Sequence, residues 1–422
     1  MGGSFRFLHA ADVHLDSPLR GLSRLEGIAV ERIRTATRAA LSRMVSIAIE
    51  EAVAFVVIAG DLYDGDWRDF RTGLFFAAEM GRLNEAGIAV YLLHGNHDAE
   101  SQITRQLTLP ANVHVFDTRR PQSFRHGGLD VALHGQSFAT RDVTDNLALD
   151  YPAPDAGLFN IGVLHTGLGG MGGHANYAPC AIQDLENRGY DYWALGHVHQ
   201  AAVLREKPHV VFPGNLQGRH IRETGPKGAM LVSVEDGEVS SLETVPCDTV
   251  RWALVPVAVD GASSFGAVLD RIGRALDEAV RAAADGRLLA CRVVLGGRTE
   301  AHPELIVAGE KLLTEAQALA LGLGNEVAWV EKVMIETATV QAPVERADAI
   351  GELRSMLEAG VASGELPTLL GDDLRDFMRA LPHDLRAGTE DPVLRAILDD
   401  DPGALIREIG PYLAARLAEG EG

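Results

Sequence analysis

The chain has 422 residues, 46% of them hydrophobic and 23% charged, and it carries a formal net charge of -21 at pH 7. This length exceeds what one hydrophobic core usually organises, so we expect two or three domains of a soluble globular protein. No run of about 18 uncharged apolar residues occurs, which argues against a membrane-spanning segment. The cysteines Cys180, Cys247 and Cys291 lie far apart, which favours reduced packing residues in a cytoplasmic protein over a disulfide framework.

The negative charge argues against a nucleic-acid partner only weakly. Phosphate backbones favour basic surfaces, but much of the acidity lies in the tail. From Glu345 onward there are 17 acidic and 8 basic residues, a net charge of -9. Cations bound to acidic ligands would offset part of the remainder. The placement of the charge therefore matters more than its total.

At the start of the chain, short apolar runs alternate with helical patterns. Strands are expected at residues 5–11, 54–59 and 88–93, and helices at residues 28–51 and 73–84. A polar cluster follows each strand: Asp12-Val13-His14, Gly60-Asp61, and Gly95-Asn96-His97-Asp98. Open α/β sheets bind ligands at the carboxyl ends of their strands, so we expect these clusters to converge.

After Asn112 the pattern changes to shorter strand-like runs separated by turns, which indicates a mixed or antiparallel sheet. The expected strands cover residues 113–116, 131–134, 161–165, 192–197, 210–212 and 229–234. Two of these runs end on histidines, at His165 and at Gly196-His197-Val198-His199. Both parts of the region are therefore expected to contribute to one site.

A second unit is expected to begin near Arg251. Its pattern predicts strands at residues 252–259, 288–295 and 327–335 and helices at residues 265–280 and 305–321, hence a small α/β domain. Beyond Val344, prolines separate short helical stretches, one of which places Ile350, Leu353, Met356 and Leu357 on a single face. The predicted domains are residues 1–250, 251–340 and 341–422.

The first clusters offer ligands for a divalent cation. Asp12 and His14 stand two apart in an extended segment, so both side chains face the same way and can meet one cation. Asp61 leaves its strand at a glycine that lets the backbone turn sharply, and it is the candidate for a carboxylate shared by two cations.

The later clusters offer the remaining ligands for a pair of cations. Asn96 offers an amide oxygen, and His165 and His197 offer imidazoles to a second cation, while His199 would return to the first. Any one of these residues alone is more often a turn residue or a buried histidine. All seven in this order reverse that expectation and favour a two-metal phosphoesterase.

Phosphodiester cleavage also requires the leaving alkoxide to be protonated or stabilised. His97 directly follows the candidate ligand Asn96, and the carboxylate of Asp98 could orient its imidazole and raise its basicity. The alternative role is hydrogen bonding within a turn. We take His97 and Asp98 as the candidate catalytic residues.

These motifs resemble the calcineurin-like metallophosphoesterases, and the wider sequence is similar to SbcD-type DNA-repair exonucleases, most of all to their YhaO-type branch. The resemblance is carried by His9-Ala10-Ala11-Asp12-Val13-His14-Leu15-Asp16-Ser17-Pro18, Gly60-Asp61-Leu62-Tyr63-Asp64, His94-Gly95-Asn96-His97-Asp98, Gly196-His197-Val198-His199 and Pro213-Gly214-Asn215-Leu216-Gln217-Gly218-Arg219-His220. It implies an α/β fold in which two sheets form a sandwich flanked by helices. A small α/β capping domain and a short helical C-terminal region would follow.

The resemblance also implies two divalent metal ions, with manganese preferred. One would be held by Asp12, His14, Asp61 and His199, and the other by Asp61, Asn96, His165 and His197, with His97 at the phosphate. DNA is the implied substrate, and a coiled-coil ATPase of the SbcC kind is the implied partner. The acidic tail would dock that partner, or else pack on its own protein. No membrane partner is expected, and a homodimer remains open.

Two features concern the substrate. Better-known repair nucleases carry a histidine where this chain has Asp64, and a carboxylate there would repel phosphate unless it held metal-bound water or an arginine. The loop of residues 218–228 gathers Arg219, His220 and Arg222, which are candidates for contacts with the phosphate backbone. A hairpin with solvated charges is the alternative. Arg20, Arg68 and Arg71 are weaker candidates.

Our leading hypothesis is a manganese-dependent DNA nuclease, an exonuclease or endonuclease acting in DNA repair, that cleaves phosphodiesters through a metal-bridging hydroxide. The nearest rival is an enzyme of the same fold that acts on a small phosphodiester or nucleotide. A scaffold that has lost catalysis is a second rival, and the complete ligand set argues against it.

Overall fold

The computed structural model describes residues 3–17, 28–64, 70–100, 108–170 and 176–340, together with short stretches between residues 355 and 410. The described residues form two compact units. The first unit comprises Met1–Ala253 with Val280–Ala290 and Gly324–Trp329, and the second comprises Leu254–Ala279, Cys291–Leu323 and the chain from Val330 on. The domain limits expected from the sequence stay a prediction. Within the described residues, no helix is long and apolar enough to cross a membrane.

The first unit contains two six-stranded sheets, and the first of them has the order β12-β11-β1-β2-β3-β4. Its strands are β1 (Phe5–Ala10), β2 (Phe55–Ala59), β3 (Ala89–Leu93), β4 (Val113–Val115), β11 (Gly228–Glu235) and β12 (Glu238–Pro246). Strands β1 to β4 run parallel, whereas β11 pairs antiparallel with β1. The helices α1 (Ile28–Glu50) and α2 (Phe70–Glu85) connect the parallel strands, as the sequence predicts.

The second sheet has the order β5-β6-β7-β8-β10-β9. Its strands are β5 (Gln122–Arg125), β6 (Val131–Gly135), β7 (Phe159–His165), β8 (Tyr192–Gly196), β9 (Ala202–Glu206) and β10 (His209–Phe212). The four inner strands are parallel, and the edge strands β5 and β9 pair antiparallel, which confirms the expected mixed sheet. Two runs expected in the same region, β4 and β11, instead belong to the first sheet.

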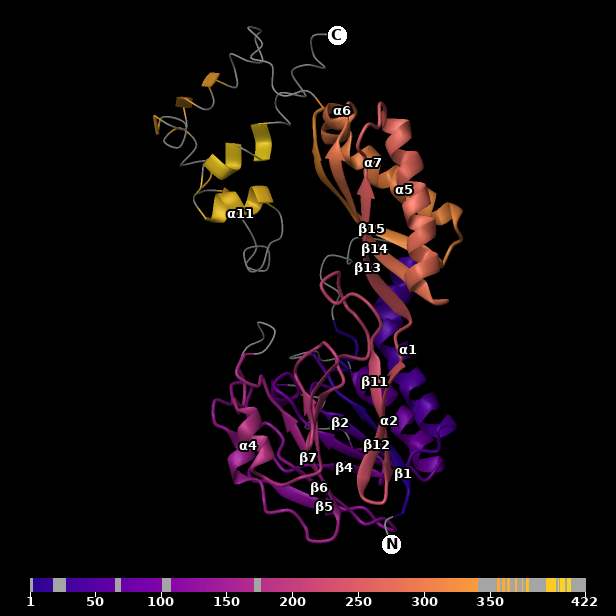
Figure 1. Cartoon of the computed structure of the whole chain (residues 1–422), viewed down its shortest axis with the longest axis vertical. Coiled ribbons are helices and arrows are strands. Elements are labelled where there is room, and N and C mark those ends of the chain that lie inside the picture. Colours follow the sequence, from indigo (N-terminus) through magenta and orange to yellow (C-terminus); the bar gives the residue numbers. More distant parts are fainter. Residues whose placement is uncertain are drawn as a thin grey trace. The chain divides into compact units, whose positions relative to one another are not determined.

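The two sheets pack face to face through an aromatic core. The ring of Phe7 on β1 stacks on Phe55 at 5.0 Å between centroids and meets Tyr192 of the other sheet edge-on at 5.3 Å. Helices α1 and α2 cover the outer face of the first sheet, and α4 (Ile182–Glu186) covers the outer face of the second (Figure 1). The chain therefore has the predicted α/β sandwich of two sheets flanked by helices.

This packing brings the carboxyl ends of strands from both sheets together. Two glycines are needed for the close approach. A Cβ atom at Gly196 would lie 2.0 Å from the carbonyl oxygen of Ala59, and one at Gly60, where φ is +100°, would lie 2.4 Å from Nδ1 of His165. Only a residue without a side chain fits at either place.

The three-stranded sheet β13-β14-β15 and its helices follow the order expected from the sequence. The elements are β13 (Val250–Ala258), α5 (Phe265–Ala279), β14 (Leu288–Arg298), α6 (His302–Val307), α7 (Gly309–Gly322) and β15 (Ala328–Ala338). Helix α5 buries Phe265, Val268, Ile272 and Leu276 on one face. One helix was expected at residues 305–321, but two helices meet at Ala308, whose φ of -92° and ψ of 27° are not helical.

The C-terminal region is described only in part. Helix α11 (Pro392–Leu398) is an ordinary helix with Ala396 buried. Ile350, Leu353 and Leu357 of the predicted apolar helix face lie outside the described residues. The expected short helical region is therefore described only at α11 and a few isolated turns.

Candidate dinuclear metal centre

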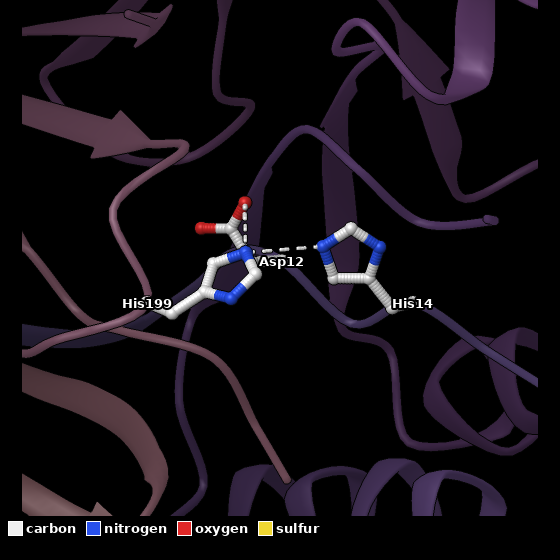
Figure 2. A group of neighbouring side chains, drawn as sticks. All are labelled: Asp12, His14 and His199. Carbon is white, nitrogen blue, oxygen red and sulfur yellow. Dashed lines mark hydrogen bonds and ion pairs between the residues drawn. The ribbon is translucent and has the colours of Figure 1, made fainter. Parts of the chain in front are cut away.

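The first group of ligands consists of Asp12, His14 and His199, whose candidate ligand atoms lie within 4.8 Å of one another. Nε2 of His14 faces Nε2 of His199 at 3.2 Å, and the latter lies 3.9 Å from Oδ1 of Asp12, as Figure 2 shows. Asp12 and His14 are buried. Two imidazole nitrogens and a carboxylate that converge away from water form a donor set suited to a divalent cation.

The second group consists of Asp61, His165 and His197, with Asn96 beside it. Nδ1 of His165 lies 3.0 Å from the carbonyl oxygen of Ala59 and must donate to it, which leaves Nε2 as an acceptor in the neutral ring. Yet Nε2 faces another acceptor, Oδ1 of Asn96, at 3.0 Å. Two acceptors this close repel each other unless a positive charge lies between them, and a bound cation would supply that charge.

The raised pKa of His165 also indicates that a positive charge is favoured at this position. Burial lowers the pKa of this imidazole, but the carboxylate of Asp61 outweighs burial and raises it to about 9. A proton therefore occupies the position when no cation does. Because a divalent cation carries more charge, it would displace that proton.

Asp61 lies between the two groups. Its Oδ2 is 3.9 Å from Nε2 of His14 in the first group and 3.5 Å from Nε2 of His165 in the second. Its Oδ1 accepts a hydrogen bond from the backbone N–H of His97 at 3.0 Å. This is the location that a carboxylate shared by two cations requires.

The backbone is strained at several of these positions. Asp12, His14, Asp61 and His197 all have positive φ, at 51°, 44°, 52° and 103°. Non-glycine residues adopt such angles rarely and at a cost of roughly 1–3 kcal/mol each, and such strain concentrates at functional sites. The carboxylate of Asp12 helps to hold the arrangement, since it accepts hydrogen bonds from the N–H of His197 at 3.1 and 2.9 Å.

The partner of His97 differs from the sequence-based expectation. The carboxylate of Asp98 accepts three hydrogen bonds from backbone amides, those of Leu62, Tyr63 and Gly95, at 2.9 to 3.1 Å. The prediction that Asp98 orients the imidazole of His97 is therefore wrong. Asp98 instead connects the loop that carries Asp61 to the loop that carries His97. Burial and the charge of Asp61 raise the pKa of Asp98 to about 7.

The imidazole of His97 pairs with Asp64 instead. Its Nδ1 lies 3.0 Å from Oδ1 of Asp64. The same oxygen is 3.6 Å from Nδ1 of His14, and Oδ2 accepts a hydrogen bond from Ser17 at 2.5 Å. Burial raises the pKa of Asp64, but its close contacts with the imidazoles of His14 and His97 outweigh burial and hold that pKa well below its usual range. Asp64 is therefore a charged partner of two imidazoles.

Sequence reasoning missed Glu223, which lies against the candidate ligand His199. Its Oε1 lies 2.6 Å from Nδ1 of His199. Burial raises the pKa of Glu223, but the contact with His199 and the charge of Arg219 outweigh burial and hold that pKa well below its usual range. The one available signal is that Glu223 belongs to the charged loop of residues 218–228, although it lies 24 residues beyond His199.

In the loop predicted to contact phosphate, residues 218–228, some basic side chains point inward and others are exposed. Arg219 points inward, with 15% of its side chain exposed, toward Asp64 and Glu223. His220 and Arg222 are exposed. Lys227 is buried and donates to the carbonyl oxygen of His199 at 2.8 Å. Of the weaker candidates, Arg71 is exposed on α2, while Arg20 and Arg68 lie outside the described residues.

Two family models match separate parts of the chain. The calcineurin-like phosphoesterase family model matches residues 5–201, and the model of the metallophosphoesterase YhaO middle domain matches residues 252–338. The uncharacterized metallophosphoesterase YhaO of Bacillus subtilis is 39% identical over 270 residues, which are 63% of this chain. The chain spans 66% of that relative's length.

Two further proteins are more distant. The DNA double-strand break repair protein Mre11 of Methanopyrus kandleri is 25% identical over 438 residues, covering 94% of this chain and 84% of that protein. The crystal structure of a dimetal phosphatase from Danio rerio aligns with a TM-score of 0.35 and 12% identity, over 57% of this chain and 97% of the other. The chain therefore contains a calcineurin-like metallophosphoesterase domain, followed by a domain that matches the YhaO middle domain.

Proposed function

We propose that this phosphodiesterase is a manganese-dependent DNA nuclease, an exonuclease or endonuclease that acts in DNA repair. The observation that carries the proposal is the carboxylate of Asp61 between two ligand groups, with His97 attached to the same carboxylate through its N–H at 3.0 Å. The similarity to Mre11 proteins supports DNA as the substrate class.

The residues of the site divide the chemistry among them. Two cations, when bound by the two groups, would supply an activated water and neutralise charge on the phosphate. Asp64 holds Nδ1 of His97, so Nε2 is the atom left to give a proton to the departing oxygen. The imidazole of His97 is 32% exposed, so it can meet a substrate from solvent, whereas Asp61 and His165 stay buried as ligands.

Manganese fits the mixture of ligands. Carboxylate and amide oxygens suit Mn²⁺, while imidazole nitrogens also suit zinc and iron. The ligand groups combine both kinds of donor: Asp12 and Asp61 offer carboxylate oxygens, and His165 and His199 offer imidazole nitrogens. We therefore propose Mn²⁺ as the working metal, to be tested by comparing activity after chelation and reloading with single metals.

The exposed members of the loop at residues 218–228 would contact the DNA backbone. His220 and Arg222 are exposed, and guanidinium groups bind phosphate oxygens in two-pronged fashion. Contacts of this kind weaken as salt rises, because they release counterions from DNA.

The test compares two substrates in the presence of MnCl₂. We expect release of nucleotides from linear duplex DNA and also turnover of bis-p-nitrophenyl phosphate. Arg222→Gln should raise KM for DNA and leave the small substrate unaffected, because only DNA reaches beyond the metal site. Turnover of the small substrate with no cleavage of duplex or single-stranded DNA would reject the nuclease proposal in favour of a small-molecule phosphodiesterase.

A protein partner is a further part of the proposal. The acidic residues beyond Glu345 would dock a coiled-coil ATPase of the SbcC kind, as an amphipathic helix docks in a groove. Sedimentation of the purified protein with and without such an ATPase tests this, and sedimentation of the protein alone shows whether it is a homodimer. Removal of residues 345–422 should abolish the complex and spare cleavage of the small substrate.

A further inference from the structure

The two histidines of the first ligand group are each backed by a carboxylate. Their Nε2 atoms face each other at 3.2 Å across the site (Figure 2). On the outer side, Nδ1 of His199 hydrogen-bonds to Glu223 at 2.6 Å, whereas Nδ1 of His14 has no hydrogen-bond partner and lies 3.6 Å from Oδ1 of Asp64. Both imidazoles therefore point one nitrogen inward and the other at an acid.

This arrangement selects one tautomer of each ring. A neutral imidazole can bind a cation through Nε2 only if its single proton is on Nδ1. A carboxylate beside Nδ1 favours that proton position, fixes the ring and makes Nε2 a stronger donor. Asp64 and Glu223 therefore prepare His14 and His199 for a cation before it arrives.

Arg219 links the two carboxylates. Its Nη1 lies 3.8 Å from Oδ2 of Asp64, and its Nη2 lies 3.4 Å from Oε1 of Glu223. The backbone N–H of Arg219 also donates to Glu223 at 2.7 Å, and the amide of Asn215 donates to the same acid at 3.0 Å. Only 15% of the Arg219 side chain is exposed, and its guanidinium also lies 3.4 Å from Oγ of Ser17 and 3.4 Å from Nδ1 of His199, so it is held among the residues around the first ligand group.

The second ligand group is supported differently. Nδ1 of His165 donates to the carbonyl oxygen of Ala59, a neutral backbone acceptor, at 3.0 Å. Loss of a carboxylate near His14 or His199 leaves this contact in place. Apart from the shared Asp61, the histidines His14 and His199 of the first position and His165 of the second therefore have different outer partners.

We propose that Asp64, Arg219 and Glu223 form an outer clamp that positions His14 and His199 and sets the affinity of the first cation position alone. The proposal rests on the two-cation site of the proposed function. It assigns Arg219 to the acids of the clamp, and leaves the DNA backbone to the exposed His220 and Arg222.

The experiment measures Mn²⁺ binding without any substrate, by calorimetry and by electron paramagnetic resonance of the loaded full-length protein. The test variants are Glu223→Gln and Arg219→Met, which remove the charge of one acid and the link between both acids. The matched control is Glu186→Gln, because Glu186 also pairs with an arginine, Arg205, at 3.0 Å, but outside the metal centre. Thermal unfolding of the metal-free proteins reports folding.

We expect each test variant to weaken one of two binding steps on the order of 10- to 100-fold, the usual effect of losing a partner of a metal ligand. The resonance should change from that of a coupled Mn²⁺ pair to that of isolated ions at limiting metal. The control should bind like wild type. Asp64→Asn should behave like the test variants, and it keeps the test valid if Glu223→Gln fails to fold.

Three results would overturn the clamp. One is unchanged affinity at both steps in folded variants, another is an equal loss at both steps, and the third is an Arg219→Met variant that binds metal normally and only raises KM for DNA. Because no substrate enters the binding measurement, a failure of the nuclease proposal would leave its outcome unaffected.

Discussion

The buried histidine between the two sheets makes the stability of this protein depend on pH. His9 on β1 is fully buried, and its Nε2 lies 3.1 Å from the carbonyl oxygen of Leu195, to which it must donate. Its Nδ1 therefore accepts from the hydroxyl of Tyr192 at 3.0 Å. The neutral ring satisfies both contacts. Burial lowers the pKa of His9 to about 3, although the hydrogen bond to Leu195 acts to raise it.

The sign follows from the two end states. Above pH 6.5, His9 is neutral in the folded and unfolded chain, so it contributes no pH dependence. Below that value the unfolded chain takes up a proton that the folded chain does not, and stability falls until the pH reaches the folded pKa. With an unfolded pKa of about 6.5 and a folded pKa of about 3, the loss at pH 5 is about 2 kcal/mol.

The perturbation is His9→Gln, whose amide can still donate to Leu195 and accept from Tyr192 but does not titrate. Urea unfolding of wild type and variant at pH 7 and pH 5, in the presence of a chelator, gives the free energy of unfolding without metal linkage. We expect the wild type to lose about 2 kcal/mol more than the variant between these values. Equal losses in the two proteins would refute the assignment of His9 as a buried neutral residue.

Three further changes test other parts of the structure. Metal analysis of His97→Ala should show that both cations are retained. Its kcat should fall by about a hundredfold or more, because a positioned proton donor contributes this much to the rate. Full activity would show that His97 takes no part in the chemistry. In urea titration, Asp98→Ala should lower the free energy of unfolding by about 3 kcal/mol or more, because three buried amides lose their acceptor. Asp98→Asn should lower it less. Equal effects of the two variants would contradict the amide-binding role of Asp98. Gly196→Ala should fail to bind metal or to fold, since its Cβ would lie 2.0 Å from the oxygen of Ala59. The control Gly266→Ala lies in helix α5 with no neighbour within 4 Å, so thermal unfolding should show an unchanged or slightly raised stability. A normal Gly196→Ala protein would contradict the packing of the strand ends.

The strand ends that carry the ligands were predictable because the signal is local. Asp12, Asp61 and Asn96 each follow an apolar run, and parallel strands deliver such residues to one edge of a sheet. The strand order was not predictable in the same way. Strand β11 returns beside β1 from far along the chain, and nothing within its own residues marks that pairing.

The charged partners of the histidines depend on contacts between loops. Asp98 is adjacent to His97 in sequence but turns to the amides of Leu62 and Tyr63, while Asp64 reaches the ring from another loop. Neighbours in a turn usually point in different directions, so adjacency along the chain is a poor guide to side-chain pairing. The carboxylates that contact metal ligands are therefore found from three-dimensional geometry.

The central claim is that the carboxylate of Asp61 is shared by two cations. Anomalous diffraction from crystals grown with Mn²⁺ tests it most directly, because manganese can be located without reference to the protein atoms. We expect two peaks about 3.5–4 Å apart, both within coordinating distance of Asp61, one beside His14 and His199 and the other beside His165. A single peak, or two peaks of which only one contacts Asp61, would contradict the claim.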